Sequence, residues 1–279
     1  MRFACTQCGA CCNRSPEMAL SEAAALADVF VFRLMFRLYR WPRRPAGPAN
    51  AHYETKRLLT AFAARNYQAK RASGETNYLM ISALTVDTGG GACAALKNGR
   101  CSIYERRPLA CRTVPFHYSR PEALAESDLT AFVSTPGFGC DTGPGAPIVV
   151  EAGQIVDDEA RRTRREALDL AGRDRHWEAA IARRLKPSSE CGLPGLREIE
   201  ANAAVGAMTT SMAVAWQIAA ETGRSLLRAQ LRVIDRELAA AACPPGARET
   251  LCEMRAEYQA RLGNPGLLAA VAQAACGTS

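Results

Sequence analysis

The alternation of apolar and polar positions predicts two helices, a strand and a hairpin in the first part of the chain. The run "DVFVFRLMFRLYRW" carries arginines at helical spacing, so we predict one apolar helix with a basic stripe over residues 21–40. A second helix is predicted over 53–71 from its apolar side. The run "YLMISALTV" (78–86) is short, apolar and rich in strand-forming residues, which favours a buried strand. The Asn-Gly pair of "KNGR" (97–100) predicts a small hairpin that joins "CAAL" to "CSIY".

The second half of the chain shows helical patterning almost throughout. Glycines separate the predicted helices, which cover 157–185, 196–221, 225–242, 247–262 and 265–275. The patterns together predict an α+β, mostly helical fold. A small cysteine-rich N-terminal domain with a short strand and hairpin (1–150) would be followed by an all-α C-terminal helical domain (151–279). The Gly/Pro-rich segment 134–147 would form the irregular loop near their boundary.

Twelve cysteines among 279 residues are more than an ordinary globular protein of this length contains. The first dozen residues lack the apolar core of a secretory signal, and no run has the length and apolarity of a membrane span. We therefore predict a cytoplasmic protein without a membrane span. In such a protein, clustered cysteines indicate metal or redox chemistry rather than a disulfide framework.

The net charge of +7 is unevenly distributed along the chain. Between residues 31 and 73 there are ten Lys and Arg residues and one acid, Glu54. This basic region is either a solvated helical face or a docking surface for an acidic or protein partner. No recognisable nucleic-acid-binding motif accompanies it, so we do not expect a nucleic-acid partner.

The segment "CTQCGACC" places four cysteines within eight residues near the start of the chain. Cys5, Cys8 and Cys11 have the C-x-x-C-x-x-C spacing with which bacterial ferredoxins bind a [4Fe–4S] cluster. Zinc also uses C-x-x-C pairs, usually as two separated knuckles. Neighbouring side chains point in different directions, so we do not expect Cys11 and Cys12 to bind one iron together. Cys12 then either faces a second site or is a buried thiol.

A second set of cysteines, Cys93, Cys101 and Cys111, lies in "CAALKNGRCSIYERRPLACRTVPF". Together with "CTQCGACC", this segment resembles the CxxCxxCC family, which is described as zinc- or iron-chelating and includes flagellin lysine N-methylase. The "CDTGPG" segment resembles a later cysteine motif of the family. The resemblance implies a metal or iron–sulfur centre built from up to eight cysteines: Cys5, Cys8, Cys11, Cys12, Cys93, Cys101, Cys111 and Cys140.

Two arginines, Arg107 and Arg112, flank Cys111 in the sequence. A cluster held by four thiolates is an anion overall, so nearby guanidinium groups would stabilise it and raise its potential. Both are therefore candidate cofactor-binding residues, with ordinary surface ion pairs as the alternative. His117 is a further candidate ligand near Cys111, with an ordinary surface or core histidine as the alternative. Four cysteines without ligand spacing are expected to be structural: Cys191, Cys243, Cys252 and Cys276.

Three functions are compatible with these residues. The first is a protein with an iron–sulfur centre, most simply [4Fe–4S], in a redox or protein-modifying role. The second is a zinc-stabilised interaction module. The third is an S-adenosylmethionine-dependent protein lysine N-methyltransferase resembling flagellin lysine N-methylase, in which the glycine-rich loop "LTVDTGGGAC" (84–93) would hold the cofactor. We favour that loop as the carrier of Cys93, because no predicted helix follows its glycines.

Overall fold

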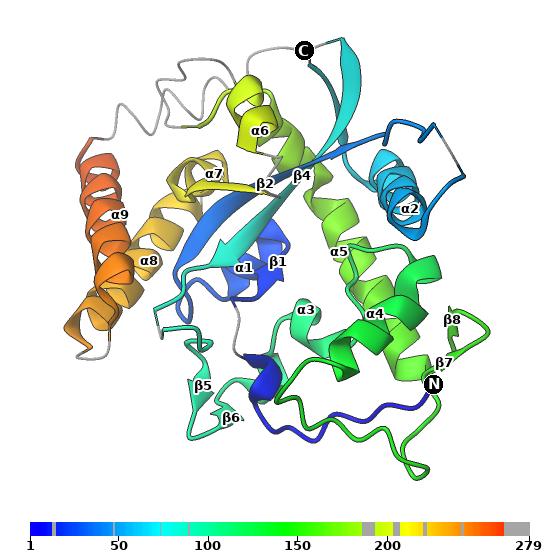
Figure 1. The fold of residues 1–279 in the computed structure, drawn as a ribbon. Helices are drawn as coiled ribbons and strands as arrows, with labels where there is room; N and C mark the ends of the chain where they lie inside the picture. The colour runs from blue at the N-terminus through cyan, green and yellow to red at the C-terminus, as the bar shows by residue number, and fades with distance from the viewer. Residues whose placement is uncertain are drawn as a thin grey trace.

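The computed structural model describes residues 1–12, 15–46, 48–72, 74–88, 90–185, 193–202, 207–219, 222–240 and 243–264, and all structural statements concern these residues. An antiparallel sheet lies at the centre, with helices around it (Figure 1). Its strands are β1 (Glu17–Met18), β2 (Phe32–Arg40), β3 (Gln68–Ala72), β4 (Glu75–Thr85) and β9 (Met208–Ser211). The strand order is β1-β4-β2-β9, and β3 also pairs with β4. The protein is therefore a mixed α+β protein.

The helix predicted over residues 21–40 is wrong. This segment forms a short helix, α1 (Leu20–Ala25), and then strand β2. The arginines at 33 and 37 suggested a helix, but a spacing of four residues also returns to the same face of a strand. All nine residues of β2 pair with β4, so tertiary pairing decides in favour of the strand. The strand predicted over 78–86 is confirmed as part of β4.

The two faces of the sheet differ in polarity. Alternate residues of β2 and β4 form the apolar face: Phe32, Leu34, Phe36, Leu79, Ile81 and Ala83. This face belongs to the largest hydrophobic cluster, together with α7 (Ala213–Ile218), α8 (Gly223–Ala239) and α9 (Pro245–Gly263). On the other face, Glu17 pairs with Arg37 at 3.3 Å and accepts a hydrogen bond from Ser82 at 3.0 Å. A buried carboxylate with two polar partners therefore lies on this second face, beside the buried side chains of Met35 and Met80.

The second half of the chain is largely helical but adds a strand to the sheet. The helices predicted over 157–185, 225–242 and 247–262 are confirmed as α5 (Asp158–Ala182), α8 and α9. The helix predicted over 196–221 is wrong, because the segment contains α6 (Leu196–Asn202), β9 and α7. The helix predicted over 265–275 lies outside the described residues.

The expected all-α second half is not confirmed, because β9 pairs with β2. The largest hydrophobic cluster also takes residues from both halves of the chain. A domain boundary at residue 150 stays a prediction. Helix α2 (Ala51–Asn66) is shorter than the predicted helix over 53–71, since the chain turns into β3 after it.

The cysteine-bearing segments gather at the end of the molecule near the N-terminus (Figure 1). They comprise a 3₁₀ turn at Ala10–Cys12, the β5–β6 hairpin (Leu96–Lys97 and Arg100–Cys101) and α3 (Leu109–Arg112). Beside them lie α4 (Ala125–Val133) and the β7–β8 hairpin (Val150–Glu151 and Gln154–Ile155). The predicted Asn-Gly turn is confirmed: Asn98 and Gly99 have φ values of 51° and 74°. Among the described helices, none has the length and apolarity needed to cross a membrane.

Candidate metal centre

The first residues of the chain run antiparallel to the loop that carries Cys140. Ala4 and Asp141 exchange two backbone hydrogen bonds, with N···O distances of 2.8 and 3.0 Å. Because Cys5 follows Ala4 and Cys140 precedes Asp141, this bridge brings the two cysteines together. The contact joins segments that lie more than 130 residues apart in the sequence.

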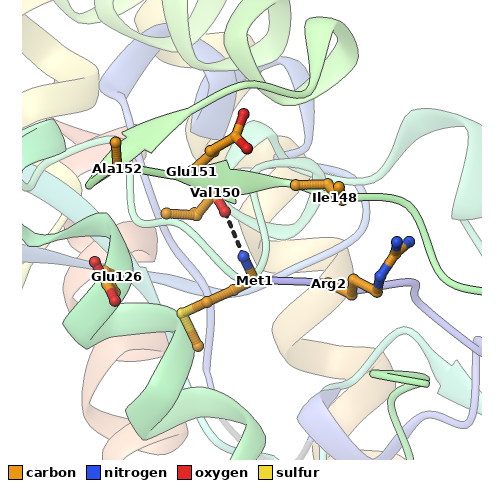
Figure 2. A pocket seen from close by; sticks show the side chains of 7 residues that line it. All are labelled: Met1, Arg2, Glu126, Ile148, Val150, Glu151 and Ala152. Atoms are coloured by element: carbon orange, nitrogen blue, oxygen red, sulfur yellow. Dashed lines mark hydrogen bonds between the residues drawn. The ribbon is translucent and has the colours of Figure 1, made fainter. Parts of the chain in front are cut away.

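The N-terminal end of this segment is anchored to the β7–β8 hairpin. The amino group of Met1 donates a hydrogen bond to the carbonyl oxygen of Val150 (Figure 2). A cavity of about 410 Å³ adjoins the anchor and is lined by Met1, Arg2, Glu126, Ile148, Val150, Glu151 and Ala152. None of these residues is a candidate metal ligand, so the anchor's role is to hold the cysteine segment in place.

Four thiols form a first set, called here the Cys5 group: Cys5, Cys8, Cys11 and Cys140. Burial raises the pKa of the Cys140 thiol, and repulsion from the other three sulfurs of the group raises it further. At Cys8 the backbone N–H groups of Ala10 and Gly139 lower the thiol pKa. A Cβ at Gly139 would lie 3.8 Å from the Cys8 sulfur, so the loop passes close to this thiol. These contacts favour the thiolate at Cys8.

The remaining four thiols form a second set, called here the Cys12 group: Cys12, Cys93, Cys101 and Cys111. Burial raises the pKa of the Cys111 thiol to about 12, and repulsion from Cys93, Cys101, Cys11 and Glu22 contributes to the rise. The Cys93 N–H donates a hydrogen bond of 2.7 Å to the Cys12 carbonyl oxygen. The glycine-rich loop after β4 therefore delivers Cys93 to Cys12.

The two groups meet at the adjacent residues Cys11 and Cys12. A hydrogen bond with the Cys11 side chain is the largest cause of the raised pKa of Cys12, followed by burial. Cys93 and Cys111 also interact with Cys12, whereas Cys140 interacts with Cys11, and Cys111 interacts with Cys11 as well. The adjacent cysteines thus lie at the junction of the two sets.

A glycine fixes the cysteine turn against the β5–β6 hairpin. Gly9 has a φ of +74°, and a Cβ there would lie 2.6 Å from the carbonyl oxygen of Gly99. No side chain fits at that distance, and the left-handed backbone also disfavours one. The Asn-Gly turn of the hairpin therefore forms the surface on which "CTQCGACC" rests.

The donor chemistry of both groups fits a thiophilic metal such as zinc or iron. All eight of these cysteines are free thiols. Several of them have raised pKa values because buried sulfurs that lie close together resist ionisation, and a bound cation would offset this repulsion. In the part of the chain that the structure describes, no three or more His, Cys, Asp or Glu side chains are arranged so that they could hold a metal ion together.

The two predicted cofactor-binding arginines have partners within the protein. The Arg107 guanidinium lies over the Tyr104 ring, 4.0 Å from its centroid. Arg112 forms an ion pair of 3.2 Å with Glu166 on α5. Their role beside a metal centre stays a prediction.

The sequence did not indicate that Glu22 belongs to this region. Its carboxylate accepts a hydrogen bond of 2.6 Å from the N–H of Leu109, at the start of the short helix that carries Cys111. Burial raises the pKa of Glu22 to about 7. The two residues are 87 positions apart, so no local signal could have linked them.

The other sequence candidates take different positions. The His117 ring stacks on Tyr118 and lies 2.6 Å from the Ser119 hydroxyl. Cys243 is buried in the largest hydrophobic cluster and Cys252 is exposed on α9. Cys191 and Cys276 lie outside the described residues.

These features define a mixed α+β protein whose thiols gather at one end in two sets. Residues 4–132 match the family model CxxCxxCC, described as "Putative zinc- or iron-chelating domain". This part of the chain therefore belongs to the CxxCxxCC family, and the assignment supports binding of zinc or iron. The matched range contains seven of the eight candidate ligands, all except Cys140. Neither the curated proteins nor the solved structures gave a match.

Proposed function

We propose that the protein binds two metal centres, one at the Cys5 group and one at the Cys12 group. The observation that carries the proposal is that the Ala4–Asp141 bridge brings Cys140 to Cys5, whereas Cys93 is hydrogen-bonded to the backbone of Cys12. Each set offers four sulfur donors, the number with which iron–sulfur clusters and structural zinc are bound. Adjacent ligands on one strand of chain suit two neighbouring centres better than one.

For the Cys5 group we propose an iron–sulfur cluster, most simply [4Fe–4S]. Its first three cysteines have the ferredoxin spacing, and Cys140 supplies the fourth thiol from a distant loop. Backbone N–H groups of Ala10 and Gly139 directed at Cys8 would stabilise the negative charge of a cluster. A bound cluster supplies one-electron redox chemistry, and the proposed role of the protein is redox or protein-modifying.

For the Cys12 group, zinc is the candidate metal. Cys93 and Cys101 lie at the two ends of the segment that contains the tight β5–β6 hairpin, and zinc-binding modules commonly present cysteines around such a turn. A zinc-stabilised module at this group would fasten the hairpin, α3 and the cysteine turn together.

Anaerobic purification with metal and labile-sulfide analysis tests the proposal. Cys8→Ser should remove the metal of the Cys5 group alone, and Cys111→Ser that of the Cys12 group alone. Cys252→Ser, at an exposed thiol on α9, is the matched control and should keep the full metal complement. Loss of all metal in both Cys8→Ser and Cys111→Ser would indicate one shared centre. If the protein contains zinc and no labile sulfide, the proposed iron–sulfur cluster is wrong and the zinc-stabilised module takes its place.

For the basic region 31–73 we propose docking of an acidic partner through its unpaired part. Ion pairs occupy some of its side chains: Arg37 with Glu17, Arg40 with Glu75 and Glu200, and Arg57 with Glu54. Arg43 and Arg44 are exposed between β2 and α2. The double variant Arg43→Glu/Arg44→Glu should lose salt-sensitive binding to an acidic peptide, and unchanged binding would exclude this part of the surface.

The cytoplasmic location and the S-adenosylmethionine-dependent methyltransferase stay predictions. The loop over 84–93 leads Cys93 to Cys12, which accounts for its glycines without a cofactor. Equilibrium dialysis of the metal-loaded protein with S-adenosylmethionine decides this alternative, and absence of binding would remove it.

A further inference from the structure

The first residues of the chain and the loop before β7 run side by side in opposite directions (Figure 1). Ala4 and Asp141 exchange both of their backbone hydrogen bonds, which makes them a hydrogen-bonded pair of an antiparallel ladder. The next opposed residues, one step along each segment, are Cys5 and Cys140. Successive pairs of such a ladder alternate in type, so the two cysteines form a non-hydrogen-bonded pair.

This register brings the two cysteine side chains to the same face at the shortest separation that a ladder offers. Opposed Cα atoms of a non-hydrogen-bonded pair are about 4.5 Å apart, and disulfides span Cα separations of about 4.4–6.8 Å. The Thr6 hydroxyl donates to the Gly139 carbonyl oxygen at 2.8 Å, so the segments stay together beyond the cysteines. Burial is the main cause of the raised pKa of Cys140, and Cys5 is the strongest of the three thiols that raise it further. The two sulfurs therefore lie within reach of each other.

Both thiols can also be reached from solvent. Cys5 is exposed, Cys140 is partly exposed, and both are free thiols. Cys8 is exposed as well, but the two backbone N–H groups described above are directed at its sulfur. A disulfide at Cys8 would weaken these hydrogen bonds, because a neutral sulfur accepts less strongly than a thiolate. At Cys5 the N–H of Gln7 approaches the sulfur at the longer distance of 3.4 Å. Cys5 therefore loses less than Cys8 when it is oxidised.

We propose that Cys5 and Cys140 form a reversible disulfide, with a low-molecular-weight disulfide such as oxidised glutathione as the oxidant. The Cys5 thiolate attacks one sulfur of oxidised glutathione, breaks its S–S bond and releases one glutathione thiolate. The Cys140 thiolate then attacks the Cys5 sulfur of this mixed disulfide and releases the second glutathione thiolate. Two electrons pass from the cysteines to oxidised glutathione, and the protons of the two thiols pass through solvent to the two glutathione molecules.

This modification regulates the Cys5 group, and that consequence rests on the metal centre proposed there. The disulfide withdraws two of the four thiolates of the group. Cys8 and Cys11 then offer only half of the ligands with which structural zinc and iron–sulfur clusters are bound. The Cys12 group keeps its four thiols. Oxidation should therefore release the metal of the Cys5 group alone, and reduction should restore its ligands.

Treatment of the full-length, metal-loaded protein with oxidised glutathione tests the proposal. After the remaining thiols are blocked by alkylation, peptide mass spectrometry should map a disulfide between Cys5 and Cys140. Metal analysis after desalting should show loss of the metal of the Cys5 group, and dithiothreitol should restore both thiols. Cys140→Ser lacks the second exchange step, so it should retain at least tenfold more glutathione at Cys5 than the wild type. Cys252→Ser, at an exposed thiol on α9, is the control and should form the disulfide as the wild type does.

Three results would overturn the proposal. The first is the absence of a Cys5–Cys140 disulfide, and the second is a disulfide that joins either cysteine to Cys8 or Cys11 in its place. The third applies where Cys8→Ser has shown a metal at the Cys5 group, and it is a Cys5–Cys140 disulfide that leaves this metal bound. Full metal retention in Cys8→Ser, measured without oxidant, would instead refute the proposed centre, and peptide mapping would then decide on the disulfide by itself.

Discussion

Replacing Gly9 by alanine should loosen the cysteine turn from the β5–β6 hairpin, and the structure allows the cost to be divided into two parts. The backbone part arises because Gly9 has a φ of +74°, which costs a residue with a Cβ about 1–2 kcal/mol. The contact part arises because the new Cβ would lie 2.6 Å from the Gly99 carbonyl oxygen. Relieving such overpacking against backbone costs roughly 1–3 kcal/mol more.

Gly153 offers a matched control for the backbone part alone. It has the same φ of +74°, in the β7–β8 turn, and a Cβ there would meet no atom within 4 Å. We expect Gly153→Ala to lower the free energy of unfolding by about 1–2 kcal/mol and Gly9→Ala by about 2–5 kcal/mol. Urea denaturation of the metal-loaded proteins measures both values, and metal analysis should show a deficit for Gly9→Ala only. Equal losses of stability in the two variants would refute the close approach of the turn to the hairpin.

Further predictions concern buried polar groups. Burial raises the pKa of Glu178 to about 8, above its unfolded value of about 4.3, so its ionisation removes stability as the pH rises through this interval. The free energy of unfolding, measured by urea denaturation between pH 5 and 8, should therefore fall less steeply with pH in Glu178→Gln, by up to about 1.4 kcal/mol per pH unit. Parallel wild-type and variant curves would contradict this. Gln230 accepts from the Phe32 N–H at 3.0 Å and donates to the carbonyl oxygens of Ala27 and Phe30 at 2.8 and 2.7 Å. Gln230→Ala should cost roughly 3–5 kcal/mol of unfolding free energy because it leaves buried backbone groups unpaired, while the exposed Gln154→Ala should cost little.

Local patterns were sufficient for some elements and not for others. The Asn-Gly turn and helices α5, α8 and α9 follow from neighbouring residues alone, so their prediction from the sequence succeeded. Strand β2 could not be distinguished from a helix, because residues 33 and 37 share a face in both structures. Only its pairing with β4, more than 30 residues away, separates the two.

The candidate site was predictable in its residue types but not in its internal arrangement. Spacing and the family resemblance identify the cysteines, and adjacency raises the question of where Cys11 and Cys12 point. The sequence gives no indication of which distant thiols each one faces. That depends on the bridge between Ala4 and Asp141 and on the hydrogen bond from Cys93 to Cys12. Both contacts join segments at least 80 residues apart, for which short-range patterns carry no information.

The two thiol groups are supported by different parts of the fold. Cys11 and Cys140 pack against the hydrophobic cluster around Phe3, Leu129 and Phe132, whereas Cys93 packs against the largest cluster, which contains the sheet. The N-terminal segment brings Cys5 to Cys140 in the Cys5 group, and the loop after β4 brings Cys93 to Cys12 in the Cys12 group. Displacing the N-terminal segment would therefore separate Cys5 from Cys140 and leave the second group attached to the core. Because the groups share the short 3₁₀ turn that bears Cys11 and Cys12, a metal bound at the Cys12 group would hold that turn in place and favour closure of the Cys5 group.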